Sequence, residues 1–430
     1  MSGADPGVVV TGVGVVCATA RDVGSFVGAL RAGTSGVRER GNADAGADPT
    51  LRPRYVADLD GFSLAESVAA LTDLPSTVRR DALRAASRAP LAIGASVAVA
   101  LEGWQDAGLH RSPVAVDRVG LVVAGHNLSG GYAEQVRARY TVSPVHLPAR
   151  FSLHFMDTDH VATVSQVLGI RGEGYTVGGA SASGNVAILN GHRLVASGAV
   201  DVCLVLGALT ELSAMELQGF YNLGAMAGAR GAAAAHERCR PFDADREGFV
   251  AGQGAACLVL ESADSARNRG VPGWGRVVGA ALRLDGNALA DPSVAGEALA
   301  MAAAIRHAGL EPAQIGYVNA HGTGSTLGDE VELAALHQVF GALRPWVNST
   351  KGLVGHCLCA AGVVEAVACL VQLRDGFVHP NANLRRPIDA GCRLAGEHAV
   401  PVDFGYALSN GFGFGGFNTS VVFGGPARDE

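Results

Sequence analysis

The stretch TVGGASASGN, residues 176–185, ends a strand-like run in very small residues and places Ser181 just before the helical sequence VAILNGHRLVASG. The N-terminus of a helix offers free backbone N–H groups and a partial positive charge. A chain that turns from a strand into a helix at a serine can display the hydroxyl as a nucleophile. Ser181 is therefore the first candidate catalytic residue.

Polar side chains interrupt apolar sequence at three further places, NAHGTGSTLGDEVE (319–332), STKGLVGHCLCAAGVVEA (349–366) and SNGFGFGGFN (409–418). The candidate residues of the first two segments are His321, Thr323, Ser325, Lys351, His356 and Glu365. Histidines can donate hydrogen bonds or move protons, and a glycine-rich loop can offer a backbone N–H to an oxyanion. Together with the nucleophile, this set indicates acyl chemistry, in which the two small hydroxyls suit a polar tether.

Other motif interpretations fail. GVGVVC (12–17) lacks the third glycine of a dinucleotide-binding fingerprint, and the pentapeptide centred on Ser181 lacks the final glycine of the hydrolase elbow. The segment LHFMDTDH carries four potential metal ligands, His154, Asp157, Asp159 and His160. Their spacing matches no standard site. We expect a polar loop there and no metal.

The composition bounds the class of protein. The chain has 430 residues, of which 48% are hydrophobic, and a net charge of −7, so it can bury a large core and is unsuited to nucleic acid as its main partner. No apolar run is long enough to span a bilayer, and we expect no signal peptide and no membrane contact. The eight cysteines form no CxxC pair and lie mostly in apolar runs, which is typical of a reducing compartment. We expect a cytoplasmic protein.

Apolar runs without alternation predict strands that helices cover on both faces. The runs are VVVTGVGVV (8–16), VGLVVAG (119–125), VDVCLVLGAL (200–209), AACLVLES (255–262) and WGRVVGAAL (274–282). Helical patterns occupy residues 22–33, 80–108, 295–309, 329–340 and 360–374, and residues 39–58 look like a free loop. The repeated rhythm predicts an α/β fold with an internal duplication. We assign residues 1–262 to a half with the nucleophile position and 263–430 to a half with both histidines.

From VVVTGVGVV through RPFDADREGFVAGQG (240–254), NAHGTGSTLGD and STKGLVGH to SNGFGFGGFN, the sequence resembles the β-ketoacyl-acyl-carrier-protein synthases, or ketosynthases, of the thiolase superfamily. The resemblance covers nearly the whole chain. It implies two similar βαβαβαββ halves in a five-layered α-β-α-β-α core, and a homodimer. It also implies an acyltransferase of polyketide or fatty-acid-like biosynthesis whose partner is an acyl carrier protein. It implies no cofactor, because the substrate arrives on the carrier's phosphopantetheine.

The resemblance gives each candidate a role. His321 and His356 match the catalytic histidines that assist decarboxylation and stabilise a thioester enolate. Lys351 matches an electrostatic lysine of that site, and Glu365 matches the buried carboxylate linked to it.

The remaining candidates match residues that hold the substrate. Thr323 and Ser325 match hydroxyls that contact the pantetheine arm. Phe414 matches a gating phenylalanine whose backbone N–H completes the oxyanion hole with that of Ser181.

Ser181 itself falls where the family has cysteine, and several other departures accompany it: Gly178, Gly179, Gln253, Gly411 and Phe417. A serine hydroxyl is not ionised near neutrality and needs a general base. An acyl-serine would be an oxyester, a poorer acceptor for a carbon nucleophile than a thioester. We therefore expect the usual two-step condensation to be slow.

Three functions remain open. In the first, a divergent stand-alone enzyme acts on a carrier-bound thioester directly and forms a C–C bond. One form of this reaction is an intramolecular aldol addition with lactonising release, as in the salinosporamide-type ketosynthase-like cyclase. The second is an ordinary decarboxylating synthase with a Cys-to-Ser substitution. The third is a non-catalytic chain-length-factor-like partner or carrier-protein-binding scaffold. The third ranks last because His321, His356 and Lys351 are retained.

Overall fold

The computed structural model describes residues 7–40, 53–228, 233–287 and 290–426. Its main strands form one continuous sheet in the order β13-β11-β10-β15-β16-β9-β1-β8-β6-β4-β5. These strands are β1 (Val8–Cys17), β4 (Val119–Ala124), β5 (Gly174–Val177), β6 (Val202–Gly207), β8 (Gly254–Ser262), β9 (Gly275–Leu284), β10 (Ile315–Asn319), β11 (Trp346–Asn348), β13 (Arg393–Leu394), β15 (Tyr406–Gly413) and β16 (Phe417–Gly424). Strand β1 pairs with β8 along its length but with β9 only at its first residues, so the sheet divides there into two wings.

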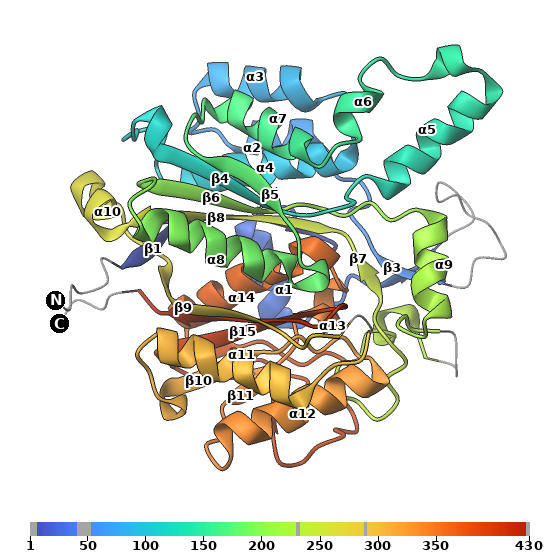
Figure 1. The fold of residues 1–430 in the computed structure, drawn as a ribbon, viewed down its shortest axis with the longest axis vertical. Helices are drawn as coiled ribbons and strands as arrows, with labels where there is room; N and C mark the ends of the chain where they lie inside the picture. Colours follow the sequence, from blue (N-terminus) through green and yellow to red (C-terminus); the bar gives the residue numbers. More distant parts are fainter. Residues whose placement is uncertain (1–6, 41–52, 229–232, 288–289, 427–430) are drawn as a thin grey trace.

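Helices cover the outer face of each wing and fill the space between the wings, giving five layers that Figure 1 shows from top to bottom. The outer layer on the N-terminal wing contains α2 (Leu64–Ala70), α3 (Ser76–Ala86), α4 (Leu91–Asp106) and α7 (Thr158–Leu168). The middle layer contains α1 (Val23–Ala32), α8 (Ser183–Ala196) and α14 (Ala361–Asp375). The outer layer on the C-terminal wing contains α11 (Val294–His307) and α12 (Thr326–Phe340). The expected α-β-α-β-α core is confirmed.

The two halves repeat one topology. The succession β1–α4–β4–α7–β5–α8–β6–β8 has the order βαβαβαββ, and β9–α11–β10–α12–β11–α14–β15–β16 has the same order. Each wing has the same strand arrangement, and the two wings meet where β1 lies beside β9. The internal duplication is therefore confirmed, although no residue-level repeat accompanies it.

The layered arrangement explains why several strands and helices are apolar throughout, without alternating polar residues. Helix α14 is buried at every residue from Ala361 to Leu373, because it contacts β8 of one wing and β15 of the other. Strands β4 and β6 are buried throughout. Side chains enclosed from both sides have no polar face to display, which removes the alternation of a half-exposed strand.

The glycines of the first strand allow a helix to approach closely. A Cβ atom at Gly12 or Gly14 would lie 2.3 Å from a carbonyl oxygen of α4, at Gly103 and Val99 respectively. These contacts are too short for any side chain. The GVGVVC segment therefore serves helix–strand packing, in agreement with the absence of a dinucleotide-binding motif.

Two sequence predictions need correction. The helix predicted over residues 80–108 is two helices, α3 and α4, separated near Pro90, because proline lacks the N–H that a continuous helix needs there. Residues 39–58 are not wholly a loop: the described part includes β2 (Arg38–Glu39) and β3 (Tyr55–Ala57), which pair with each other. Residues 41–52 lie outside the described part.

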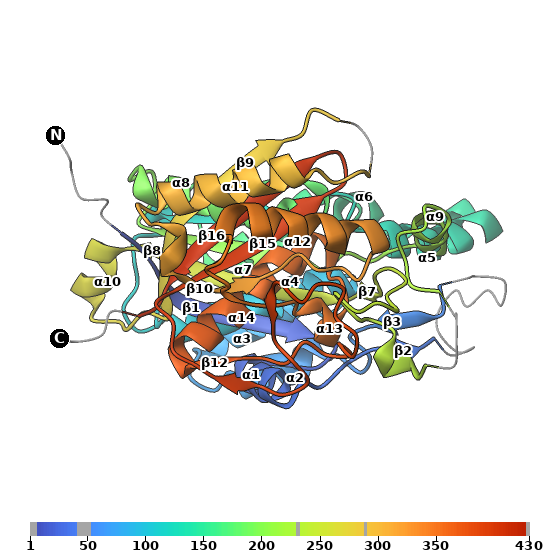
Figure 2. The same ribbon diagram turned by 90° about the horizontal axis from the view of Figure 1, so that it is seen from below.

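Smaller elements complete the chain. They are α5 (Gly130–Val142), α6 (Phe151–His154), α9 (Ala214–Asn222), α10 (Ala263–Arg269), α13 (Lys351–Val354), β7 (Ala251–Gly252), β12 (Phe377–Val378) and β14 (Val400–Pro401). Figures 1 and 2 both place β3, β7 and α9 at one end of the layered core, and Figure 2 places β2 there as well. Among the described helices, none combines the length and the apolar character that a membrane crossing would require.

Candidate active site

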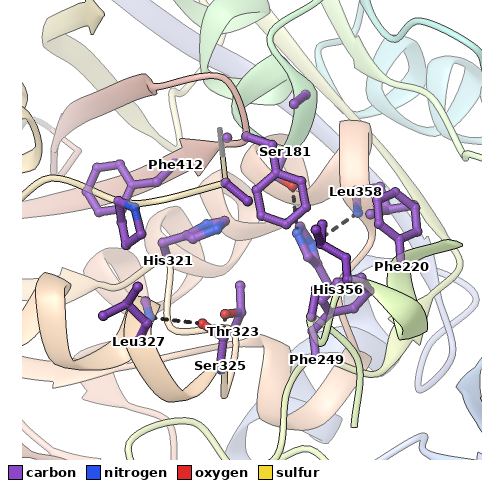
Figure 3. Close-up of a pocket in the computed structure, with 18 of the residues that line it drawn as sticks. Ser181, Phe220, Phe249, His321, Thr323, Ser325, Leu327, His356, Leu358 and Phe412 are labelled. Atoms are coloured by element: carbon purple, nitrogen blue, oxygen red, sulfur yellow. Dashed lines mark hydrogen bonds between the residues drawn. The ribbon is translucent and has the colours of Figure 1, made fainter. Parts of the chain in front are cut away.

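A cavity of about 490 Å³ lies where the two halves meet. Its lining includes Ser181, Phe220, Phe249, His321, Thr323, Ser325, His356, Phe412 and Phe414. Figure 3 shows the ring of His356 directed at Ser181, with His321 beside it and Thr323 and Ser325 on the same side as His321. The structure thus brings together candidates that are far apart in the sequence; Ser181 and Phe414, for example, are separated by 233 positions.

Ser181 lies in a short 3₁₀ turn, Ala180–Ala182, immediately before α8. It therefore precedes the helix, as the sequence predicted, although the helix begins at Ser183 and not at Val186. Ser183 fixes this turn, since its hydroxyl donates to the carbonyl oxygen of Ala180 at 2.6 Å and accepts the N–H of Gly179 at 2.9 Å. The Ser181 side chain is partly buried and faces the cavity.

A hydrogen bond joins His356, from the C-terminal half of the chain, to Ser181, from the N-terminal half. The Nε2 atom of His356 lies 2.8 Å from Oγ of Ser181, and the Nδ1 atom of the same ring accepts the N–H of Leu358 at 3.2 Å. A backbone N–H can only donate, so Nδ1 carries no proton and the proton of the neutral ring is on Nε2. His356 therefore donates to the serine oxygen.

The two histidine rings lie 5.5 Å apart between centroids, nearly perpendicular to each other. His321 follows β10, where its backbone N–H and that of Gly322 donate to the carboxylate of Glu332 at 2.8 and 2.7 Å. The ring of His356 packs edge-on against Phe249, and that of His321 packs against Phe412. Burial and the nearby Lys351 charge lower the pKa of both histidines well below the usual value. Both rings are therefore neutral at pH 7.

The positive charge of Lys351, which lies near both histidines, belongs to a buried ion pair with Glu365. Nζ of Lys351 donates to Oε1 of Glu365, and both side chains are at most 2% exposed. Burial raises the pKa of Glu365 to about 7, an effect that the lysine partly offsets. The predicted association of Lys351 with Glu365 is present. Its effect on His321 and His356 is electrostatic, because the cation disfavours an imidazolium nearby.

The hydroxyl pair at the cavity differs in its hydrogen bonds. Ser325 is the N-cap of α12, since its Oγ accepts the N–H of Gly328 at 3.1 Å. Thr323 Oγ1 accepts the N–H of Ser325 at 3.3 Å, which leaves the hydroxyl proton available to a ligand. Both residues line the cavity, and Ser325 has a structural role in addition. Their contact with a pantetheine arm stays a prediction.

Phe414 lies in the tight turn between β15 and β16, where Gly415 and Gly416 adopt positive φ angles of 85° and 75°. Its side chain is 41% exposed and approaches Phe220 with a centroid distance of 6.4 Å. An aromatic residue on a glycine turn at the cavity suits a gate. That role stays a prediction.

Sequence reasoning missed His126, which follows β4 and lines the cavity. Its Nε2 atom accepts the N–H of Ala180, next to Ser181, at 3.1 Å. A polar residue directly after a buried strand was the available signal, but nothing local indicated its target. The departure at Gly178 is now explained, because a Cβ atom there would lie 2.7 Å from Cδ2 of His126.

The LHFMDTDH segment is not the polar loop that the sequence predicted: it comprises the end of α6, a short turn and the start of α7, and its polar side chains make hydrogen bonds that hold these helices and the neighbouring loop. Asp157 accepts the backbone N–H groups of Asn127 and Leu128, while Nδ1 of His154 lies 2.7 Å from Asp159. His160 is hydrogen-bonded to Ser96. Within the described ranges, the one cluster of three potential metal ligands is elsewhere, outside the cavity lining: His337, Asp389 and Cys392.

Comparison with known families agrees with this geometry. Residues 5–266 match the model of the beta-ketoacyl synthase N-terminal domain, and residues 274–385 match that of the C-terminal domain. The chain belongs to the beta-ketoacyl synthase family. It is thus an enzyme of the acyl-transferring, ketosynthase type.

Individual relatives align with this chain over almost its full length. The polyketide biosynthesis malonyl-ACP decarboxylase PksF of Bacillus subtilis is 36% identical over 416 residues, which are 97% of this chain and 96% of PksF. The chloroplastic 3-oxoacyl-[acyl-carrier-protein] synthase II of Arabidopsis thaliana is 33% identical, over 97% of this chain and 75% of that protein. The crystal structure of a beta-ketoacyl synthase from Burkholderia phymatum superposes with a TM-score of 0.85 at 30% identity, covering 98% of this chain and all of that one.

Proposed function

We propose that this ketosynthase decarboxylates a malonyl thioester carried on an acyl carrier protein and releases it as the acetyl thioester, without condensation. The observation that most strongly supports this proposal is the hydrogen bond from His356 to Ser181. A nucleophilic serine needs a base that takes its proton, whereas here the neighbouring nitrogen already holds one. The similarity to a malonyl-ACP decarboxylase supports the same reaction.

The decarboxylation needs a stabilised enolate, and the site offers donors for it. The bond between the malonyl methylene carbon and its carboxylate breaks, CO₂ leaves, and the electron pair moves into the thioester as an enolate. The Nε2–H of His356 and the ring of His321 are neutral donors beside this position. The carbanion form then takes a proton from solvent, which completes the acetyl thioester. Preorganised donors in a buried site are worth several kcal/mol for such charge development.

A carrier protein is the proposed partner because the cavity combines a hydroxyl pair with an apolar rim. Thr323 and Ser325 offer polar contacts to a phosphopantetheine arm, and Phe220 and Phe414 border the same cavity. This set suits a long tethered arm better than a free small acid. We also propose a homodimer, since β5 is the last strand at one end of the described sheet, where a strand from a second copy would extend it.

A second candidate is the C–C bond-forming reaction, with an aldol addition and lactonising release. The observation that favours it is the size of the cavity, about 490 Å³, with Leu212, Leu223 and Phe220 in its lining. This apolar wall could accommodate an acyl group larger than malonyl. The same histidines would then stabilise the enolate before it adds to an internal carbonyl.

The test is incubation of the protein with malonyl-loaded carrier protein, followed by mass spectrometry of the intact carrier. We expect conversion to acetyl carrier protein, no acyl adduct on the enzyme, and no four-carbon product when acetyl carrier protein is added. His321→Ala is the matched inactive control. A stable acyl-enzyme together with a condensed product would refute the proposal in favour of ordinary synthase activity. Intact malonyl carrier protein would leave the cyclase as the better candidate.

A further inference from the structure

His126 lies beside the turn that contains Ser181 because the two segments follow adjacent strands, β4 and β5. Strands β4 and β5 are parallel, with Ala124 opposite Val177. The N–H of Gly125 continues the ladder to the carbonyl oxygen of Val177 at 2.9 Å. The residues that follow the two strands therefore emerge side by side. This arrangement brings the imidazole of His126 to the N–H of Ala180.

The turn at Ala180 needs an external restraint. Its φ angle is 49°, in the left-handed region that an alanine rarely occupies. The two polar groups of Ala180 are held from different sides: His126 accepts its N–H at 3.1 Å, and Ser183 donates to its carbonyl oxygen at 2.6 Å. A conformation of this kind persists only where its surroundings determine it.

These two hydrogen bonds also fix the next N–H along the chain. The carbonyl group of Ala180 and the N–H of Ser181 belong to one planar trans peptide and point in opposite directions. When Ser183 holds that carbonyl oxygen, the N–H of Ser181 has one direction. The bond from His126 holds the other side of Ala180, so the peptide plane cannot rotate about that residue.

The loop that carries His126 is itself firmly held. Both carboxylate oxygens of Asp157 accept backbone N–H groups from this loop, from Asn127 at 2.8 Å and Leu128 at 3.0 Å. Asn127 has a φ angle of 52°, which asparagine tolerates better than most residues. Gly178 supplies the space for the ring, since a Cβ atom would lie 2.7 Å from Cδ2 of His126. Three separate features thus converge on one imidazole.

We propose that His126 is a positioning residue of the reaction: it accepts the N–H of Ala180 and thereby aims the N–H of Ser181 at the thioester oxygen. In this role Ser181 contributes a backbone donor rather than a hydroxyl nucleophile. The proposal rests on the proposed function for the identity of that oxygen, but the positioning itself applies to any thioester that enters the site.

The test compares His126→Leu, which has no acceptor, with His126→Gln, whose amide oxygen can still accept the N–H of Ala180. For malonyl carrier protein we expect His126→Leu to lower kcat by about 10- to 100-fold, somewhat less than the loss of a complete oxyanion donor. KM should change less than about twofold, and His126→Gln should recover most of kcat. His398→Leu, an exposed histidine outside the cavity lining, is the matched control.

A second measurement separates this proposal from the proposed function. In a Ser181→Cys background, acylation of the new thiol by an acyl-pantetheine thioester uses the same backbone donor and no decarboxylation. We expect His126→Leu to slow acylation and His126→Gln to restore it, even if malonyl carrier protein is never decarboxylated. Such a result would retain the positioning role while rejecting the decarboxylase.

Two results would overturn the proposal. One is a His126→Leu variant with wild-type rates in both assays. The other is an equal loss in His126→Leu and His126→Gln, which would show that ring packing matters and the hydrogen bond does not. Gly178→Ala gives an independent check, because it displaces the ring without altering it. Its rates should fall as those of His126→Leu do, and unchanged rates would count against the proposal.

Discussion

The Nε2 atom of His356 lies 2.8 Å from Oγ of Ser181, while the N–H of Leu358 occupies the other ring nitrogen at 3.2 Å. The serine oxygen therefore accepts a hydrogen bond from a nitrogen that already carries a proton, and no base is placed to take the proton of the serine hydroxyl. This relationship makes the residue at the nucleophile position a passive oxygen in the resting site. It also makes the histidine a donor that can pass from serine to substrate without changing its protonation.

The hydroxyl of Ser181 should consequently be dispensable for decarboxylation. We expect Ser181→Ala to retain kcat for malonyl carrier protein within about tenfold, since the backbone N–H and both histidines remain. Ser181→Cys should instead gain a stable acyl adduct on incubation with acyl thioesters, detected as a mass increase of the enzyme. A correctly folded Ser181→Ala protein without activity would show that the hydroxyl takes part in the chemistry.

The two histidines should each be essential. Loss of one preorganised donor typically costs about 10²- to 10³-fold in kcat. We expect that loss for His321→Ala and for His356→Ala in a CO₂-release assay. The exposed His398→Ala serves as control and should keep the wild-type rate. Near-normal turnover of His321→Ala would contradict the two-donor enolate site.

The Lys351 charge should be visible in the pH dependence. Burial, then Lys351, lowers the pKa of both histidines, so they stay neutral as pH falls through 6.5 and the rate should show no inflection there. In Lys351→Met the cation is gone, and both pKa values should rise while burial still holds them down. The acid limb of the pH–kcat profile should therefore move to higher pH. An acid limb that stays in place would show that the cation does not act on the histidines.

Lys351→Met should also fold. Glu365 already has a pKa of about 7 through burial, and without the lysine that pKa rises further. The carboxyl group can then stay protonated and neutral. Because its folded-state pKa exceeds the unfolded value of about 4.3, the free energy of unfolding is highest below that value and falls as pH rises toward the folded-state pKa. Thermal unfolding of the variant measured from pH 6 to pH 9 should show a falling melting temperature.

Thr323 and Ser325 should separate into binding and structural roles. Thr323→Ala should raise KM for the carrier-bound substrate with little effect on the melting temperature, because its hydroxyl proton is available to the arm. Ser325→Ala should lower the free energy of unfolding by about 1 kcal/mol through loss of the cap on α12. Equal effects of the two substitutions on KM and on stability would contradict this separation.

Much of the fold and the candidate set could be predicted because the signals are local. Buried strands such as β4 and β6 are apolar throughout, and the residues after them interrupt that pattern visibly. His321 and His356 stand in glycine-rich breaks of this kind. The break between α3 and α4 was also marked by Pro90, but the alanine-rich pattern on both sides concealed it.

The contacts that tune the site could not be predicted in this way. His126 and Ala180 are 54 residues apart and meet only because β4 and β5 pair in parallel. The proton position on His356 depends on the backbone N–H of Leu358, which leaves no trace in residue types. Gly178 appeared as a departure with no cause until the ring beside it was placed.

The placement of sulfur in this molecule has a practical consequence. Seven of its eight cysteines are buried, and even Cys359, which lines the cavity, is only 4% exposed. Burial raises the pKa of most of these thiols, and a protonated, enclosed thiol reacts poorly with electrophiles. With an oxygen atom at the centre of its site, the enzyme should tolerate alkylating reagents and oxidants that inactivate cysteine-dependent relatives. Oxygen in place of the sulfur of the family's cysteine would thus make the site resistant to these reagents and, under the proposed function, also change the reaction that it catalyses.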